Sequence, residues 1–192
     1  FDAATQDEFK NGVAALNSGD VDGASRAFKS VIGRNPKADN AYANLAMLDE
    51  RRGDLDEAEK NYRRAIGANA DSTAGWEALP RLMCRPRRCP QIENELRVAV
   101  SANPANIGPR IGLVFSLLQQ NKSAAAETEA KKVLKSDERN VRAIQLLGTV
   151  YLRESKAELA RLVFENARAI DPNDAATHNG MGLAMLALKQ RV

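Results

Sequence analysis

The sequence predicts an all-α protein, a solenoid of antiparallel helix pairs. Three observations lead to this prediction. A period of 34 residues runs from Thr5 to the end of the chain without insertion or deletion. Small residues recur at fixed places within that period. Alanine supplies 32 of the 192 residues, and an alanine-rich sequence with few β-branched runs favours helices that pack closely.

Each period is predicted to fold as two helices joined by a turn. With Thr5 as position 1, positions 4, 7, 8 and 11 lie on one face of a first helix, and positions 20, 24, 27 and 28 on one face of a second. Small residues at positions 8 and 20 let the helices approach, and a large residue at position 24 fills the space beside them. The predicted units are 5–38, 39–72, 73–106, 107–140 and 141–174, followed by a half unit, 175–192.

Turn and capping residues fall where such pairs need them. The dipeptides Gly19-Asp20 and Gly53-Asp54 occupy positions 15 and 16, between the two helices. Proline at position 32 cannot continue the second helix, and it stands there in Pro36, Pro104 and Pro172. Residues at or just before the next first helix suit N-caps, namely Asp39, Asn106, Asn140 and Asp174.

The first two units follow this pattern with one exception. Unit one carries Glu8 and Asn11 where large apolar residues are expected, so its first helix is predicted to be a partly solvated cap. Unit two carries Tyr42, Leu45 and Tyr62 at positions 4, 7 and 24, as the pattern requires.

Unit three departs most from the pattern. Pro80 stands at position 8, inside the first helix, where proline removes a backbone hydrogen bond at a cost of about 3 kcal/mol. We predict that this helix is kinked or shortened at Pro80, that Pro86 ends it, and that the unit is the weakest of the series. Pro90 suits the first turn of the second helix.

The remaining units differ in how completely they carry the pattern. Arg110 at position 4 and Ala130 at position 24 predict a smaller core in unit four. Unit six stops after one helix, at Val192, which either caps the stack or marks where a longer array continues. Unit five is almost complete and carries Ile144, Leu147, Gly148, Tyr151, Ala160, Phe164, Ala167 and Pro172.

These residues resemble the tetratricopeptide repeat (TPR), whose 34 residues carry a large residue, Leu-Gly, Tyr, Ala, Phe, Ala and Pro in this order. The resemblance covers residues 5–192 and implies a single TPR domain over residues 1–192, a right-handed superhelical solenoid that binds a protein or peptide partner. An ordinary helical bundle is the alternative, but bundles do not need units of fixed length.

Several classes of function are disfavoured by composition. The chain has one histidine, His178, and no Ser/His/Asp constellation or glycine-rich phosphate loop, so we expect no enzyme, no catalytic residue and no cofactor. Cys84 and Cys89 lack the spacing of a metal site, and we expect neither a metal nor an obligatory disulfide there. Aromatic residues make up 5% and the net charge is only +3, so no nucleic acid is expected. The uncharged runs are too short for a membrane span.

The remaining candidate is a surface built from the first helices. Positions 2, 5, 9, 12 and 13 lie nearly opposite positions 4, 7, 8 and 11, and in a TPR stack they are expected to line the concave groove. For the apolar members the alternative is packing against the neighbouring repeat. The predicted groove residues are Val13, Asn40, Met47, Arg51, Arg81, Arg85, Ile111, Phe115, Leu118, Arg142, Gln145, Leu152 and Arg153.

Charge suggests what would bind there. Residues 77–192 carry 18 basic and 12 acidic side chains, and the densest positive cluster contains Arg81, Arg85, Arg87 and Arg88. An acidic or phosphorylated ligand would pair with that cluster, and a solvated loop is the alternative. Chaperone-type TPRs hold a terminal carboxylate with lysine at position 5 and asparagine at position 9. This sequence does not match that pattern, since unit four, for example, has Ile111 and Phe115 at these positions.

We therefore predict a non-catalytic scaffold or adaptor for protein–protein interaction. The repeats are similar in number to those of bacterial envelope TPR lipoproteins of pilus assembly or gliding motility. Because the chain begins with Phe1 rather than Met, we expect that an upstream segment was removed, which favours a periplasmic or outer-membrane-associated location over the cytoplasm. The alternatives are a TPR arm of a larger enzyme and a cytoplasmic regulator or co-chaperone. The oligomeric state is left open.

Overall fold

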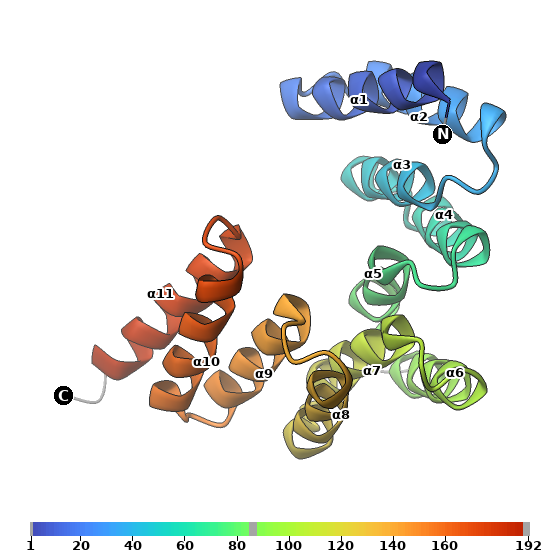
Figure 1. Ribbon diagram of the computed structural model, residues 1–192. Coiled ribbons are helices and arrows are strands. Elements are labelled where there is room, and N and C mark those ends of the chain that lie inside the picture. The colour runs from blue at the N-terminus through green and yellow to red at the C-terminus, as the bar shows by residue number, and fades with distance from the viewer. Residues whose placement is uncertain (1, 85–87, 190–192) are drawn as a thin grey trace. The chain divides into compact units, whose positions relative to one another are not determined.

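Helices form all the regular structure in the part of the chain that the computed structural model describes, residues 2–84 and 88–189 (Figure 1). Those residues contain eleven helices and no strand. The first helices of the units are α1 (Ala3–Ser18), α3 (Asp39–Arg52), α5 (Thr73–Met83), α7 (Ile107–Gln119), α9 (Val141–Arg153) and α11 (Ala175–Lys189). The second helices are α2 (Val21–Arg34), α4 (Leu55–Ala68), α6 (Cys89–Ala102), α8 (Ser123–Ser136) and α10 (Ala157–Ile170).

The helix boundaries repeat with the 34-residue period. All five second helices begin at position 17 and end at position 30 of their units, and every first helix except α1 begins at position 1. The predicted fold class, a solenoid of five helix pairs and one final helix, is confirmed. None of the helices in the described ranges is both long enough and apolar enough to cross a membrane.

The turn inside each described pair depends on a left-handed residue at position 15. Gly19 and Gly53 have φ values of 83° and 84°, and Asn121 and Ser155 take φ values of 58° and 60° at the equivalent places. Glycine adopts this conformation without strain, whereas a Cβ disfavours it. Asn106 and Asn140 cap the following helices as predicted, but Ala38 takes the cap position before α3, and Asp39 is its first residue.

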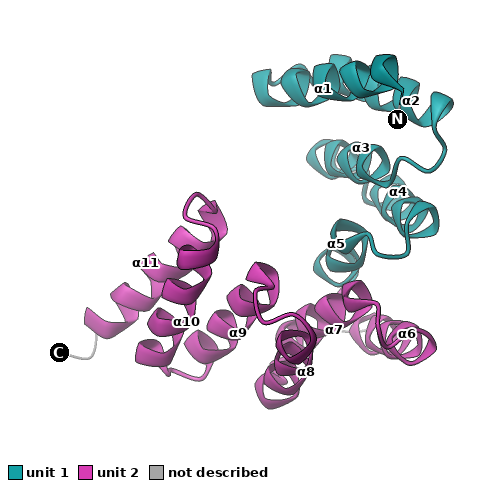
Figure 2. Ribbon diagram, viewed as in Figure 1, with its two compact units in different colours: residues 1–83 teal, residues 84–192 magenta. Residues whose placement is uncertain are grey.

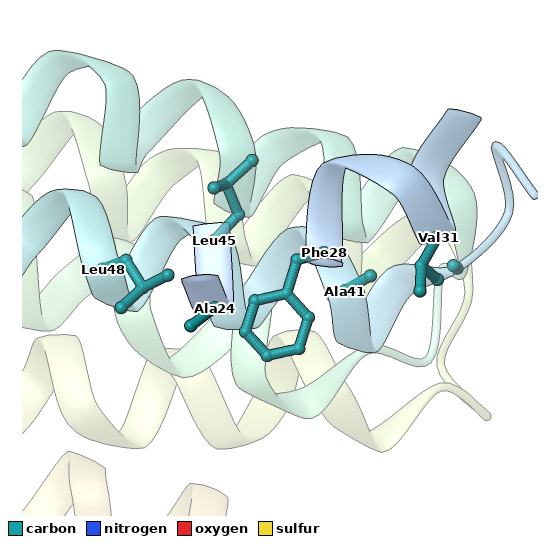
Figure 3. Packing of buried hydrophobic residues seen from close by; sticks show 7 residues of the cluster. Ala24, Phe28, Val31, Ala41, Leu45 and Leu48 are labelled. Atoms are coloured by element: carbon teal, nitrogen blue, oxygen red, sulfur yellow. The ribbon is translucent and has the colours of Figure 1, made fainter. Parts of the chain in front are cut away.

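The chain forms two compact units, residues 1–83 and 84–192, which Figure 2 colours separately. In the first unit, Phe28 of α2 is fully buried with Ala41, Leu45 and Leu48 of α3 (Figure 3). In the second, Phe164 of α10 packs with Ala160, Ala184 and the half-buried Tyr151, Leu152 and Met181. These clusters use positions 20 and 24, as the pattern predicts. A single domain over residues 1–192 stays a prediction.

Pro80 lies inside α5, which continues for three residues beyond it to Met83. This helix has 11 residues, whereas the other first helices have between 13 and 16. The predicted shortening is present, but the helix does not stop at the proline. Pro86 lies outside the described residues.

The expectation that Cys84 and Cys89 stay unbridged is wrong. The two residues form a disulfide, with Cα atoms 4.3 Å apart. Cys84 directly follows the last residue of α5, and Cys89 is the first residue of α6. The bridge therefore links two residues that both lie at the start of the second compact unit.

Candidate partner-binding surface

The predicted groove residues define a first-helix face, the side chains at positions 2, 5, 9, 12 and 13 of the first helices. In the first compact unit, Val13 and Met47 are half-buried, and Asn40, Arg51 and Arg81 are exposed. This part of the face therefore presents polar side chains beside partly covered apolar ones. Arg85 lies outside the described residues.

Arg81 of α5 makes a two-pronged ion pair with Glu50 of α3, within the first compact unit. Its guanidinium donates two hydrogen bonds of 2.6 Å to the carboxylate of Glu50, and the Tyr62 hydroxyl donates a third, of 2.5 Å, to Oε1 of Glu50. Burial acts to raise the pKa of Glu50, but the hydrogen bonds from Arg81 and Tyr62 outweigh it and lower the pKa. Burial and the bond to Glu50 raise the pKa of the Tyr62 hydroxyl. An acidic ligand at Arg81 would have to compete with Glu50.

In the second compact unit, the face is centred on Phe115 and Arg142. The guanidinium carbon of Arg142 lies 5.0 Å from the centre of the half-buried Phe115 ring. This cation–π contact joins α7 to α9 and holds a planar cation on an aromatic surface. Arg142 also donates a hydrogen bond of 3.1 Å to the side-chain oxygen of Gln145.

Gln145 extends this chain of contacts to the start of α11. Its amide nitrogen donates to the Asp174 carboxylate at 2.6 Å and to the Thr177 hydroxyl at 2.9 Å. Asp174 accepts the backbone N–H of Thr177 at 2.6 Å, and this bond is the main cause that lowers the pKa of Asp174. Gln145 is only 6% exposed, so it positions its neighbours and offers little surface itself.

Two of the predicted groove residues belong to the core. Ile111 and Leu118 are 0% and 3% exposed, because α7 packs against α6, α8 and α9. The prediction that these two residues lie on the binding face is therefore wrong. The alternative, that they pack against neighbouring helices, is correct for both. Leu152 is half-buried on this face. Arg153 is exposed and donates to the backbone carbonyl of Leu118 and, at 3.4 Å, to the Asn121 side chain.

A model of the tetratricopeptide repeat family matches residues 9–73 and 113–175, which is more than half of the chain. The chain belongs to the tetratricopeptide repeat family. TPR domains are generally non-catalytic modules that bind protein or peptide partners. No curated protein matches the chain.

Solved TPR structures resemble the chain in fold. A thermophilic TPR protein of Thermus thermophilus has a TM-score of 0.72 at 19% identity, with 95% of this chain and 99% of the other covered. Yeast Tom70 has a TM-score of 0.65 at 16% identity, with 96% and 40% covered. PilW, described as a widely conserved type IV pilus biogenesis factor, has a TM-score of 0.59 at 15% identity, with 99% and 93% covered.

Sequence reasoning missed two pockets, each lined by the second helix of one repeat and by both helices of the next. One, of about 310 Å³, is lined by Lys29, Ile32, Tyr42, Leu45, Asp49, Glu57, Asn61 and Arg64. The other, of about 390 Å³, is lined by Arg97, Val100, Ser101, Pro104, Arg110, Leu113, Glu129 and Lys132. Most of the lining residues occupy equivalent positions two units apart, as Lys29 and Arg97 do.

The sequence did contain one sign of these pockets, the polar residue at position 23 in each of them. Asn61 is buried and donates to Asp49 at 2.8 Å, and Glu129 is buried and accepts from Arg110 at 2.5 Å and Lys132 at 2.8 Å. A polar side chain at a buried position requires a partner. In the described ranges, no three His, Cys, Asp or Glu residues gather as metal ligands would.

Proposed function

We propose that this chain is a non-catalytic scaffold that binds a protein partner on the first-helix face of its second compact unit. The observation that carries the proposal is the half-buried Phe115 ring with the Arg142 guanidinium 5.0 Å from its centre. Aromatic residues and arginine are enriched at protein–protein interfaces, and arginine is among the residues in which binding energy concentrates. Leu152 and Arg153 extend the same combination of apolar and basic groups along α9.

The partner segment that suits this surface carries acidic residues beside apolar ones. An apolar side chain would cover the exposed part of the Phe115 ring, and a carboxylate would approach the Arg142 guanidinium. Val13, Asn40, Met47 and Arg51 form a separate and more polar first-helix face on the first compact unit, residues 1–83, which is a second candidate surface. Arg81 contributes less charge than its exposure suggests, because Glu50 already pairs with it.

The first step of the test isolates a partner by its binding to the purified chain. The Phe115→Ala protein serves as the negative control in this step. The recovered protein is then titrated against the variants. We expect Phe115→Ala to weaken binding by about 1–3 kcal/mol with folding intact. Arg142→Glu should slow association and change its salt dependence.

Charge and size changes on the second helices are the controls. Glu57→Ala, Glu59→Ala and Lys132→Ala alter α4 and α8 and should leave the affinity unchanged. If these variants abolish binding while Phe115→Ala and Arg142→Glu bind normally, the assignment of the face is wrong.

We propose further that the scaffold acts in an oxidising compartment, such as a bacterial envelope. The Cys84–Cys89 disulfide supports this location, because disulfides persist in secreted and periplasmic proteins and are rare in the cytosol. Acid trapping of the protein from its source cells, followed by thiol alkylation, should leave both cysteines unlabelled. Labelling of both cysteines without a reductant would overturn this location.

A further inference from the structure

We infer that the pocket between α6, α7 and α8 binds a small organic phosphate monoester. This phosphate pocket is the one of about 390 Å³ that Arg97, Arg110 and Lys132 help to line. It lies within the second compact unit, and its basic side chains stand at positions 4, 25 and 26, which are not positions of the first-helix face. Its volume is near the lower end of the range of small-molecule pockets, roughly 300–1,000 Å³, so its occupant is small.

Three basic side chains reach the phosphate pocket from three different helices. Arg97 belongs to α6, Arg110 to α7 and Lys132 to α8. The buried Glu129 carboxylate accepts from Arg110 at 2.5 Å and from Lys132 at 2.8 Å, so these two cations lie within the width of one carboxylate. A phosphate monoester has three strong acceptor oxygens, whereas a carboxylate has two. The phosphate is therefore the anion that can accept from all three cations together.

The phosphate pocket keeps an excess of positive charge after its ion pairs are counted. Among the described residues that line it, three are basic and Glu129 is acidic. Arg97 donates to Glu93, which does not line the pocket, at 2.8 Å, but Glu93 also accepts from Lys122 at 2.7 Å. Including Glu93 and Lys122 therefore leaves the excess unchanged, at two positive charges. A phosphate monoester carries a charge of about −1.5 to −2 at pH 7, which matches this excess.

Arg110 departs from the repeat pattern and supplies the least exposed of these cations. It stands at position 4, where units two and three carry Tyr42 and Trp76. Its side chain is only 14% exposed, and an ion pair is stronger where water is partly excluded. The pair with Glu129 uses Nη1 of Arg110, and a guanidinium has N–H donors on all three of its nitrogens. Arg110 can therefore hold Glu129 and a phosphate oxygen at the same time.

Apolar side chains complete the wall of the phosphate pocket. The half-buried Val100, the exposed Pro104 and the buried Leu113 line it together with the cations. A small apolar group attached to the phosphate would pack against these three residues and remove apolar surface from water. The occupant is therefore an organic phosphate rather than the inorganic ion.

The equivalent pocket of the first compact unit shows that the repeat geometry alone does not create this charge. Positions 25 and 26 are again basic there, as Lys29 and Arg64, but position 4 is Tyr42. Asp49 and Glu57 also line that pocket, so its basic and acidic side chains are equal in number among the described residues. This pocket has no excess charge, and it is a control within the same molecule.

Isothermal titration calorimetry of the purified chain with phenyl phosphate is the test. At about pH 8 the ester is doubly charged, because its second pKa is about 6. We expect saturable binding of one phenyl phosphate per chain. Phenyl sulfate has a similar shape and one negative charge less, and it should bind about tenfold more weakly, because hydrogen bonds between two charged groups are the strong ones.

Arg97→Gln and Lys132→Gln should each weaken the binding of phenyl phosphate about tenfold, because each removes a hydrogen bond to a charged group. Both variants should fold. Glu93 keeps Lys122 as a partner in the first variant, and Glu129 keeps Arg110 in the second. Circular dichroism checks this.

Lys29→Gln and Arg64→Gln are the matched controls. They make the same changes at positions 25 and 26 of the pocket in the first compact unit. Both proteins should bind phenyl phosphate as tightly as the parent does, because this ligand is not expected in that pocket.

Four results would overturn the inference. The first is no saturable binding of phenyl phosphate. The second is equal affinity of the parent, Arg97→Gln and Lys132→Gln proteins, or an equal loss in the Lys29→Gln and Arg64→Gln controls. The third is binding of inorganic phosphate as tight as that of phenyl phosphate, since the apolar wall would then contribute nothing. The fourth is a phosphotyrosine peptide that binds more than about tenfold tighter than phenyl phosphate, since the phosphate would then belong to a protein.

Discussion

Position 15 is the place where a single residue decides the geometry of each described turn. Gly19, Gly53, Asn121 and Ser155 all take positive φ there. Left-handed backbone costs a residue with a Cβ about 1–2 kcal/mol, and asparagine is among the side chains that visit it most readily. Of the four residues at position 15, Ser155 therefore tolerates the left-handed conformation least well.

Ser155→Gly should raise the free energy of unfolding by about 0.5–1 kcal/mol, because it removes the Cβ clash and keeps the turn. Urea denaturation measures the change. Asn121→Gly should raise the free energy of unfolding by a smaller amount, and Gly53→Ala should lower it by about 1 kcal/mol. A Ser155→Gly protein no more stable than its parent would contradict the argument.

Position 20 is constrained by packing. Ala58 and Ala160 are both fully buried between helices. Ala160→Leu should therefore lower the free energy of unfolding by about 1–3 kcal/mol through overpacking. Ala169→Leu, at an exposed position of α10, is the control and should change stability little. Equal stability of the two variants would mean that the register is wrong.

Between elements, a buried carboxylate connects α6 to the residues that follow α7. Glu93 of α6 accepts hydrogen bonds from Lys122 at 2.7 Å, Arg97 at 2.8 Å and Gln120 at 2.7 Å. Burial acts to raise the pKa of Glu93, but the three hydrogen bonds outweigh it and lower the pKa to about 2. One carboxylate thus joins α6 to the turn between α7 and α8.

This network predicts a pH dependence of stability. Because the folded pKa of Glu93 lies below the unfolded value of about 4.3, its stabilisation is present above that pH and is lost as the pH falls towards 2. We expect the ionised Glu93 to contribute about 1–3 kcal/mol to the free energy of unfolding, because its partners Lys122 and Arg97 are half-exposed and solvent screens them.

Glu93→Gln should be less stable than the parent at pH 7, and the difference should shrink below pH 4. Urea midpoints at several pH values measure this convergence. Glu158→Gln, at an exposed ion pair on α10, is the charge control. A constant difference between the parent and Glu93→Gln across the pH range would contradict the assignment.

In the whole molecule, repeats communicate through their neighbours, so a weak unit limits cooperativity. The boundary between the two compact units falls between residues 83 and 84, within unit three. Repeat unit three also holds Pro80 and the shortest of the described helices, α5.

Amides of α5 should therefore exchange with solvent faster than those of α9, as measured by hydrogen–deuterium exchange. Pro80→Ala should slow exchange in α5 and raise the free energy of unfolding by about 1–2 kcal/mol, because it restores a backbone hydrogen bond but loses some packing. Pro109→Ala is the control, since Pro109 lies in the first turn of α7, where proline is tolerated. Protection in α5 equal to that in α9 would contradict the prediction.

The sequence by itself determined the repeat register, the helix pair in each full unit, the turn at positions 15 and 16 and the small residues at position 20 of most units. These features depend on local periodicity and on spacing within one helix pair, which a linear pattern contains. Only the tertiary structure decided that Ile111 and Leu118 are buried, that Glu50 pairs with Arg81, and that the cysteines are bridged. Each of these depends on which side chains neighbouring helices bring to the same place, and a helical pattern read one helix at a time does not contain that information.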